Sequence, residues 1–521
     1  MTSCLKLTSS VRKVSLLAAF LLTACAQNPP ASLPTPDPAA LRAAGPVTLT
    51  NRLAWGVSPS FVQHVQAIGT QKFVEEQLHP GPDAALPPEI QARIAAMRIS
   101  TTPLPELMAQ MEQQRRAADA KTDDEEKKAA QRSYQQDMGA LAKEAATRAL
   151  LRDLYSPAQL REQLVWFWMN HFNVFQQKGN LRATVGDFEE NAIRPYALGH
   201  FRDLLRATAR HPTMLTYLDN EQNAAGHINE NYAREIMELH SMGIGSGYSQ
   251  HDVQELARVL TGMGTNYDNH TAKVRPARQA QYVHTGLFEF NPERHDYSDK
   301  QFLGQTIHGG GIEEVDSVID LLARQPATAR FVSTRLATYF LGVPPSPALV
   351  ARLADSYQRS DGEIAAVLRT LFYSQEFLQS LDHGFKDPVH YVVSAVRLAY
   401  DTRPILNTNP MLGWIDRMGE PLYGHLTPDG YPLDMNAWNS SGQMNTRFEI
   451  ARIIGNNSAG LFKSDATPPV ERPAFPQLAN ALFYAQQEKR LAPATREALS
   501  QATSQQEWNT LWLSSPEMMR R

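Results

Sequence analysis

Apolar residues recur three and four positions apart over most of this chain of 521 residues, and that spacing limits the fold more than any other feature. It places the apolar side chains on one side of a helix. The pattern is clearest in the stretches 59–80, 156–172, 199–220, 249–263, 311–342 and 361–377. We therefore expect a mainly α fold, a multi-helix globular bundle with long irregular loops.

The helical periodicity fades between residues 264 and 311, where Gly, Tyr, Asn and His become frequent. We expect a long loop there with at most a small β-hairpin, in which residues 281–290 form one strand. A second irregular stretch, 400–450, is rich in Pro, Gly and Trp. Local signals predict a helix break at Gly69 and capping boxes that begin helices at Ser156 and Ser249.

The first 24 residues have the pattern of a secretory signal peptide. Basic residues precede an apolar run at 14–22, which is shorter than the roughly 20 apolar residues that span a bilayer. The run leads into "LTAC", residues 22–25, which resembles the lipoprotein box in which the cysteine is lipidated. We predict a signal peptide over 1–24 and lipidation of Cys25; the alternative is an ordinary signal peptide with a coincidental cysteine. Ala26, instead of an aspartate, favours the outer membrane of a Gram-negative bacterium, facing the periplasm.

The rest of the chain divides by composition. The lipidated Cys25 begins a Pro- and Ala-rich tether over 25–46, whose composition favours extended chain. A helical domain is expected over 47–521. Within it, residues 105–150 are highly charged with little apolar periodicity, which indicates a solvated helical hairpin or a mobile excursion. The lipid at Cys25 is the only membrane anchor that the sequence implies.

Composition excludes several classes of function. The chain has two cysteines; Cys4 is removed with the signal peptide and Cys25 carries lipid, so disulfides and thiolate metal sites are not expected. The net charge is −4, with acidic and basic residues mixed along the chain. A nucleic-acid partner is not expected, because it requires a basic face.

The densest group of chemically active residues is "HINENYAREIMELHSMGIG", residues 227–245. Its pattern predicts a helix from Glu230 to Met242, with Asn229 as the N-cap and Gly243 as the terminating glycine. The stretch therefore forms about three turns with two distinct faces.

The polar face of this helix contains Glu230, Arg234, Glu235, Glu238 and Ser241, and Leu239 lies on the apolar face. The spacing of four residues pairs Arg234 with two glutamates, which stabilises a solvated face by a few tenths of a kcal/mol per pair. His240 lies instead on the apolar face in the last turn. Burial there lowers its pKa, whereas the helix C-terminus favours its protonated form. His240 is either a core histidine bonded to a backbone carbonyl or part of a buried site.

A second histidine, His171, lies on an apolar stripe with Trp168 and Phe175. Its structural role, like that of His240, competes with a role in a shared buried polar site. His211, at a helix start before Pro212, is a third candidate. Three histidines with a carboxylate suit a divalent transition metal such as zinc or iron, but no local spacing enforces such a site.

Three other short motifs resemble functional sites or lie where one could form. "HGGG", residues 308–311, resembles the oxyanion loop of lipases, but no serine lies in a G-x-S-x-G context, so a glycine turn is expected. "GIGSGYS", residues 243–249, lacks the dinucleotide-binding spacing and is expected to be a turn between helices. "HDYSDK", residues 295–300, lies in the irregular region and is a candidate for the substrate side of a cleft.

Several segments together carry a family resemblance. "NRLAWGVSP" (51–59), "WFWMNHFNVF" (166–175), residues 192–220, residues 229–262, "HDYSDKQFLG" (295–304) and "KDPVHYVVSAVR" (386–397) follow one another in this order. In these the chain resembles the DUF1800 family of exported bacterial proteins of undefined activity, over residues 47 to 515. The resemblance assigns no catalytic residue. It implies a DUF1501-type protein, itself similar to sulfatases and alkaline phosphatases, as a partner.

Two functions remain open. The first is a cell-envelope hydrolase with a buried His/Glu site, with or without a metal. Its candidate ligands or general bases are His171, His211 and His240, its proton-transfer partners Glu230, Glu235 and Glu238, and its anion clamps Arg194 and Arg234. The alternative is a non-catalytic envelope scaffold or a lipoprotein that binds a polymer or a partner.

Overall fold

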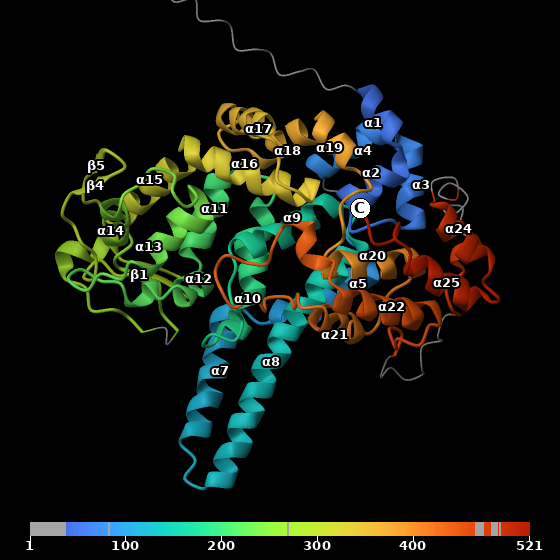
Figure 1. Ribbon diagram of the computed structural model, residues 1–521. Coiled ribbons are helices and arrows are strands. Elements are labelled where there is room, and N and C mark those ends of the chain that lie inside the picture. Colours follow the sequence, from blue (N-terminus) through green and yellow to red (C-terminus); the bar gives the residue numbers. More distant parts are fainter. Residues whose placement is uncertain (1–37, 82–83, 268–269, 464–473, 481–487, 489–490) are drawn as a thin grey trace, which may run out of the picture. The chain divides into compact units, whose positions relative to one another are not determined.

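The computed structural model describes residues 38–81, 84–267, 270–463, 474–480, 488 and 491–521. The predicted signal peptide, Cys25 and most of the tether lie outside these residues. Helices dominate the described part of the chain, and the strands are short (Figure 1), so the mainly α fold is confirmed. None of the described helices combines the length and the apolar character needed to cross a membrane.

Short helices form the N-terminal part of the fold. Proline at the first helical position begins several of them, where its missing N–H has no intrahelical partner to lose. Gly69, with a φ of 84°, separates two of them, as predicted. The helices are α1 (Pro38–Ala44), α2 (Pro46–Leu53), α3 (Pro59–Ile68), α4 (Thr70–Leu78), α5 (Pro88–Ala95) and α6 (Arg98–Thr101).

The charged stretch 105–150 folds as a helical hairpin of α7 (Leu104–Asp119) and α8 (Asp124–Tyr155), which run side by side (Figure 1). Leu107, Met111 and Met138 belong to a small apolar cluster between the two helices. The turn and most side chains near it are exposed. The C-terminal half of α8 instead contributes to the main core, so one helix joins an exposed arm to the interior.

The middle of the chain contains α9 (Gln159–His171) and the helices that surround it. Trp166 in α9 packs against both large apolar cores of the protein, one centred on α9 itself and one on α20. This position at the boundary between two cores fixes the orientation of the polar side chains on α9. The neighbouring helices are α10 (Leu181–Asp187), α11 (Phe201–Arg210), α12 (Pro212–Tyr217), α13 (Asn231–Glu235) and α14 (Gln250–Val259), with 3₁₀ turns η2 (Arg194–Tyr196) and η3 (Asn220–Gln222).

Two of these helices continue as π-helical segments, η1 (Phe188–Ile193) and η4 (Ile236–Ser241). In η4 the backbone N–H of Met242 donates to the carbonyl of Met237 at 3.0 Å, five residues back. π-Helical turns are rare and recur at functional sites. The helix predicted over residues 230–242 is therefore present, with a widened last turn.

The widened turn changes which residues of this helix are buried. Ser241, predicted on the polar face, is buried and donates to the carbonyl of Ile236 at 2.6 Å. Leu239, predicted on the apolar face, is only half-buried. Gly243 ends the helix with a φ of 86°, and a Cβ atom there would lie 2.7 Å from the Phe331 ring. The terminating glycine is thus confirmed, with a steric reason in addition to the backbone one.

Short strands occupy the irregular region after α14. A three-stranded antiparallel sheet has the order β1-β3-β2, and a separate hairpin pairs β4 with β5. The prediction that 281–290 forms one strand was wrong, because Gly286, with a φ of 62°, turns it into two. The strands are β1 (Met263–Thr265), β2 (Val283–Thr285), β3 (Phe288–Phe290), β4 (Lys300–Phe302) and β5 (Gln305–Ile307); η5 (Pro276–Gln281) precedes β2.

Helices return after the strands and continue to the C-terminal part. Those that belong to the first core are α15 (Ile312–Ala323), α16 (Pro326–Leu341), α17 (Pro347–Arg359), α18 (Ile364–Phe372) and α19 (Gln375–Ser380). Those of the second core are α20 (Pro388–Tyr400), α21 (Asn409–Arg417), α22 (Ser441–Gly455), α24 (Pro493–Ser500) and α25 (Gln505–Leu513), with 3₁₀ turns η6 (Met435–Trp438) and η7 (Leu478–Asn480).

Candidate functional site

His171 and His240 lie close together in the aromatic core, each 1% exposed. Their ring centroids are 6.3 Å apart, and His171 Nε2 donates to the backbone carbonyl of His240 at 3.0 Å. The ring of Phe172 contacts both histidines, and Trp168 contacts His171. The burial predicted for both residues is confirmed, and the fold brings these two candidates together.

Burial keeps both imidazoles neutral. It lowers the pKa of His171 well below the usual 6.5 and that of His240 to about 3, and the positive charge of Arg335 acts in the same direction. This desolvation outweighs the helix-end effect that favours a protonated His240. Among the described residues, His171 Nδ1 and His240 Nε2 have no hydrogen-bond partner. The pair is therefore a neutral, buried polar feature in an apolar environment.

The predicted carboxylates of the same helix face another way. Arg234 donates to Glu230 at 3.1 Å and to Glu238 at 3.3 Å, which is the partly exposed ladder that the spacing predicts. Glu235 is half-buried, and burial together with the charge of Glu238 raises its pKa. No hydrogen bond or ion pair links Glu235 or Glu238 to the two core histidines within the described chain.

His211 lies apart from the core pair, at the start of α12. Its Nδ1 accepts from the backbone N–H of Thr213 at 3.2 Å, and its Nε2 donates to Asp187 at 2.9 Å. Helix capping and a hydrogen bond to a carboxylate thus use both ring nitrogens. His211 and Asp187 also line a cavity of about 510 Å³ whose other walls include Leu287 and Phe288.

The three histidines do not form a metal centre as they stand. Across the described residues, no group of three His, Cys, Asp or Glu side chains is placed so that it could hold a metal ion. His171 and His240 meet without a carboxylate, whereas His211 pairs with Asp187 elsewhere. The weak metal prediction therefore gains no support from the geometry of these residues.

Arg194 has a different environment from that expected of an anion clamp. It donates to Glu162, contacts Glu189 at 3.5 Å, and lies 3.4 Å from Glu190. Burial opposes ionisation of Glu162, but the charge of Arg194 overcomes it and lowers the pKa of Glu162. The guanidinium is thus fully engaged with carboxylates of the protein itself.

These residues belong to a buried network that we call the carboxylate–arginine cluster. Its ion pairs join α8, α9, η1 and η2. Its members are Arg148, Arg152, Arg194, Glu162, Glu189, Glu190 and Asp153.

Asp153 is the member of the cluster without a counter-charge. Burial, followed by the charges of Glu162 and Glu189, raises its pKa well above the usual value. A neutral Asp153 leaves three arginines facing three glutamates, so the cluster is balanced. An acid held protonated beside ionised carboxylates is an arrangement that acid–base enzymes use.

The cluster borders a small cavity. Asp153, Glu162 and Glu189 line it together with Tyr423, whose hydroxyl donates to Glu189 at 2.7 Å. Only about 40 Å³ of the cavity is open to water. One water requires about 10–15 Å³, so the cavity has room for a few waters and is too small for a substrate.

A loop closes this cavity from the other side. Asn170 donates to the carbonyl of Tyr431 at 2.9 Å and accepts from its backbone N–H at 2.6 Å. Asn173 donates to the carbonyls of His425 and Thr427. Two side chains that flank His171 in the sequence therefore hold the loop 421–431 in place.

The "HDYSDK" motif is mostly turned inward. His295 donates through Nδ1 to the carbonyl of Thr261 at 2.7 Å, and its Nε2 contacts Glu314, which also pairs with Lys300 at 2.8 Å. These three ionisable side chains are at most 1% exposed. The fold therefore uses His295 and Lys300 inside the protein, away from the surface of a cleft.

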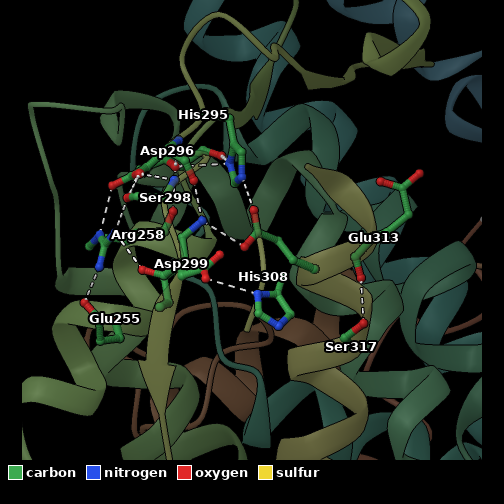
Figure 2. Close-up of polar contacts among 12 residues, drawn as sticks. Glu255, Arg258, His295, Asp296, Ser298, Asp299, His308, Glu313 and Ser317 are labelled. Carbon is green, nitrogen blue, oxygen red and sulfur yellow. Dashed lines mark hydrogen bonds and ion pairs between the residues drawn. The ribbon is translucent and has the colours of Figure 1, made fainter. Parts of the chain in front are cut away.

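Other residues of the motif make a partly exposed network. Figure 2 shows Arg258 between Glu255 and Asp296, at 2.6 and 2.8 Å, with Asp299 bound to His308 at 3.1 Å. This network joins α14 to the segment before β4. The glycines after His308 lead into α15, in agreement with the expected turn.

A further group was not predicted. His390 Nδ1 donates to Asp387 at 2.6 Å, and Asp387 caps α20 by accepting from the backbone N–H of His390 at 2.7 Å. Burial lowers the pKa of His390 to about 4. The signal in the sequence was "KDPVH": an aspartate before proline begins a helix, and a histidine three residues later lies beside it.

Comparisons with known proteins identify a family but no activity. A family model described as "Protein of unknown function (DUF1800)" matches residues 48–520. No curated protein and no solved structure matches the chain. The function must therefore be argued from the side chains themselves.

Proposed function

Because this chain belongs to the DUF1800 family of proteins of unknown function, we propose its role from its own residues: it is an exported, lipid-anchored envelope protein that binds a partner. The export and anchoring rest on the signal pattern over 1–24 and on Cys25. The likeness of "LTAC" to the lipoprotein box is the observation that supports them.

One observation favours partner binding over hydrolysis by the predicted His/Glu site. His171 and His240 are neutral, are packed among aromatic rings, and line none of the cavities around Asp153, His211 or Lys386. A general base must reach the proton that it removes, directly or through a water. The two histidines instead have the surroundings of structural core residues.

The hairpin of α7 and α8 is the surface that we assign to the partner. Its apolar cluster keeps the two helices together, while charged side chains cover the turn between them. Charged, exposed surfaces contribute to the rate and specificity of protein association. The partner that the family resemblance implies is a DUF1501-type protein.

Anchoring is tested with Cys25→Ala. In cells that express the natural chain, we expect the protein in the outer-membrane fraction, with an N-terminal peptide whose mass includes diacylglycerol and a fatty acid. The Cys25→Ala chain should lose that lipid mass, and Cys4→Ala is the matched control. Natural protein that leaves the membrane in buffer, with unmodified Cys25, would contradict the proposal.

Partner binding is tested by titration calorimetry with a purified DUF1501-type protein from the same bacterium. Replacement of residues 112–132 by a short Gly-Ser turn should weaken binding at least tenfold. The control variant, His171→Leu with His240→Leu, should bind normally once folded. Equal binding by the natural and shortened chains would remove the hairpin from the interface.

A hydrolase remains the second candidate, supported by the carboxylate–arginine cluster. Asp153 is an acid with a raised pKa beside other carboxyl groups, and it lines a cavity with room for water; acid–base hydrolysis uses such paired carboxyl groups. Substrate entry would need the loop 421–431 to move. Chromogenic esters, glycosides, sulfates and phosphates test this: turnover that Asp153→Asn abolishes and Asp355→Asn preserves would favour the hydrolase.

Metal content separates the two forms of the hydrolase. Elemental analysis of purified protein that shows one transition metal per chain would favour a metal-assisted enzyme. In that case, His171→Leu, His211→Leu and His240→Leu identify the ligands by the loss of bound metal. A chain without bound metal that still hydrolyses a substrate would assign the chemistry to carboxylates alone.

A further inference from the structure

A cavity of about 520 Å³ lies between α2, α20 and the C-terminal segment. Its size is within the range of small-molecule sites, roughly 300–1,000 Å³. Apolar side chains dominate its walls, and polar groups gather around Lys386. The lining residues include Val47, Val57, Leu398, Leu491, Trp512 and Met518, with Asn51, Asp382, Lys386, Ser394, Glu517 and Arg520 as the polar members.

Lys386 is an unusual residue to find there, because its side chain is buried, with an exposed fraction of 2%. Its Nζ donates to the carbonyl of Met518 at 3.0 Å. No carboxylate of the described chain lies within 4.0 Å of this nitrogen. An ammonium group has three N–H donors, so one acceptor leaves most of its hydrogen-bonding capacity unused.

The backbone holds this lysine firmly. Its N–H donates to the carbonyl of Met519 at 2.8 Å, and its own carbonyl accepts from Arg447 at 2.7 Å. Asp387, the next residue, caps α20. The backbone of Lys386 is therefore fixed at the wall of the cavity, and Nζ is anchored by the Met518 carbonyl.

The charges around Lys386 favour the neutral amine. Burial, followed by the positive charges of Arg521 and Arg447, lowers the pKa of Lys386 to about 7, against the opposing effects of Asp382 and Asp387. A lysine that is desolvated and next to other cations is activated as a nucleophile. A larger fraction of Lys386 than of an exposed lysine therefore has a free lone pair near neutral pH.

We propose that Lys386 is a carbonyl-binding site, at which a small aldehyde or ketone with an apolar body forms an imine. The Nζ lone pair attacks the carbonyl carbon, a C–N bond forms, and the proton released from nitrogen moves to the oxygen. The hydroxyl group then leaves as water together with the second proton of the nitrogen, and the C=N bond forms. The step involves no net oxidation or reduction and is reversible, and it does not depend on the partner-binding proposal.

Reductive trapping tests the site on the full chain. Butanal and sodium cyanoborohydride at pH 7 should convert Lys386 to butyl-lysine, found by mass spectrometry of the peptides. We expect Lys386 to react at least about tenfold faster than Lys72 and Lys121, whose side chains are 66% and 49% exposed. The selectivity should disappear in urea, where all lysines are equivalent.

The pH profile and a cavity variant give independent checks. Labelling of Lys386 should level off above about pH 8, while labelling of Lys72 should keep rising to pH 10. Ala492→Trp, at an exposed position of the lining, should slow labelling of Lys386 and leave Lys72 unchanged. Lys386→Arg should remove the selective label, provided that its circular dichroism matches the natural chain.

The outcomes that overturn the proposal are equally specific. If Lys72 and Lys121 are labelled while Lys386 stays unmodified, the buried amine does not reach a carbonyl ligand. If Lys386 is labelled no faster than the surface lysines, its environment does not activate it. Unchanged labelling of Lys386 in the Ala492→Trp chain would show that the probe does not enter through this cavity.

Discussion

The histidine pair of the aromatic core and the carboxylate–arginine cluster bury ionisable groups in opposite ways. His171 and His240 give up their charge, because burial holds them neutral. The cluster keeps its charges and matches them, with Arg194 among glutamates and only Asp153 neutral. The comparison teaches that burial alone does not mark a functional site; what distinguishes the cluster is an acid with a raised pKa that lines a cavity with room for water.

The largest effect should follow from breaking the charge balance. Arg194→Met removes the guanidinium that pairs with the buried Glu162 and Glu189, and we expect it to lower the free energy of unfolding by about 3–5 kcal/mol. Arg234→Met removes a guanidinium from the partly exposed ladder and should cost less than about 1 kcal/mol. Urea denaturation measures both. Equal losses would mean that the cluster and the ladder do not differ in burial energetics.

The histidine pair should make the protein less stable as the pH falls. Below pH 6.5 the two histidines bind protons in the unfolded chain but not in the folded chain. Each histidine therefore lowers the free energy of unfolding by about 1 kcal/mol per pH unit. For His240 this continues until the pH approaches about 3. The His171→Leu, His240→Leu double variant should show a shallower decline between pH 7.5 and 5.5 in urea denaturation. Identical declines would show that the histidines are not buried neutral.

The contribution of Asp153 to stability should change with pH in the opposite direction. Its raised pKa means that the folded chain keeps a proton which the unfolded chain releases, so this residue adds stability as the pH falls. Asp153→Asn should therefore raise the free energy of unfolding more at pH 8 than at pH 5. Asp355→Asn, a change at an exposed residue, is the control. A gain that does not change with pH would contradict a protonated Asp153.

The smallest effect is expected at the exposed end of the hairpin. Lys128 pairs with Glu125 at 3.0 Å, with side chains 61% and 78% exposed. Lys128→Ala should change the free energy of unfolding by less than about 0.5 kcal/mol. The same change should still weaken association with the DUF1501-type partner if charge guides the encounter, which rate measurements at low and high salt would reveal. A large loss of stability would mean that this end of the hairpin is not solvated.

Helix positions and the burial of single residues could be predicted from the sequence. The apolar periodicity indicated that His171 and His240 face the interior, and both do. The capping box at Ser249 is confirmed, with Asp252 as its second member. These features depend on residues close in the sequence, where spacing determines direction.

Features that depend on contacts between residues distant in the sequence were either not predicted or predicted wrongly. The capping box at Ser156 does not form, because Gln159 instead accepts from the backbone N–H of Trp55, more than 100 residues away. The carboxylate–arginine cluster was missed for the same reason, since periodicity does not say which helix faces which. Leu239 is more exposed than its position on a regular α-helix predicts, because the π-helical turn contains an extra residue that changes the direction of the side chains.

Helix α8 also connects the exposed turn of the hairpin to the carboxylate–arginine cluster. Its 32 residues make it about 48 Å long, and it runs without a break from the exposed turn to the interior. Arg148, Arg152 and Asp153 all lie in its last turns. A load applied at the far end by a bound protein would therefore be delivered to the charge-balanced cluster, which has little freedom to accommodate it. The exposed arm and the buried charged groups of the cluster are parts of one continuous helix.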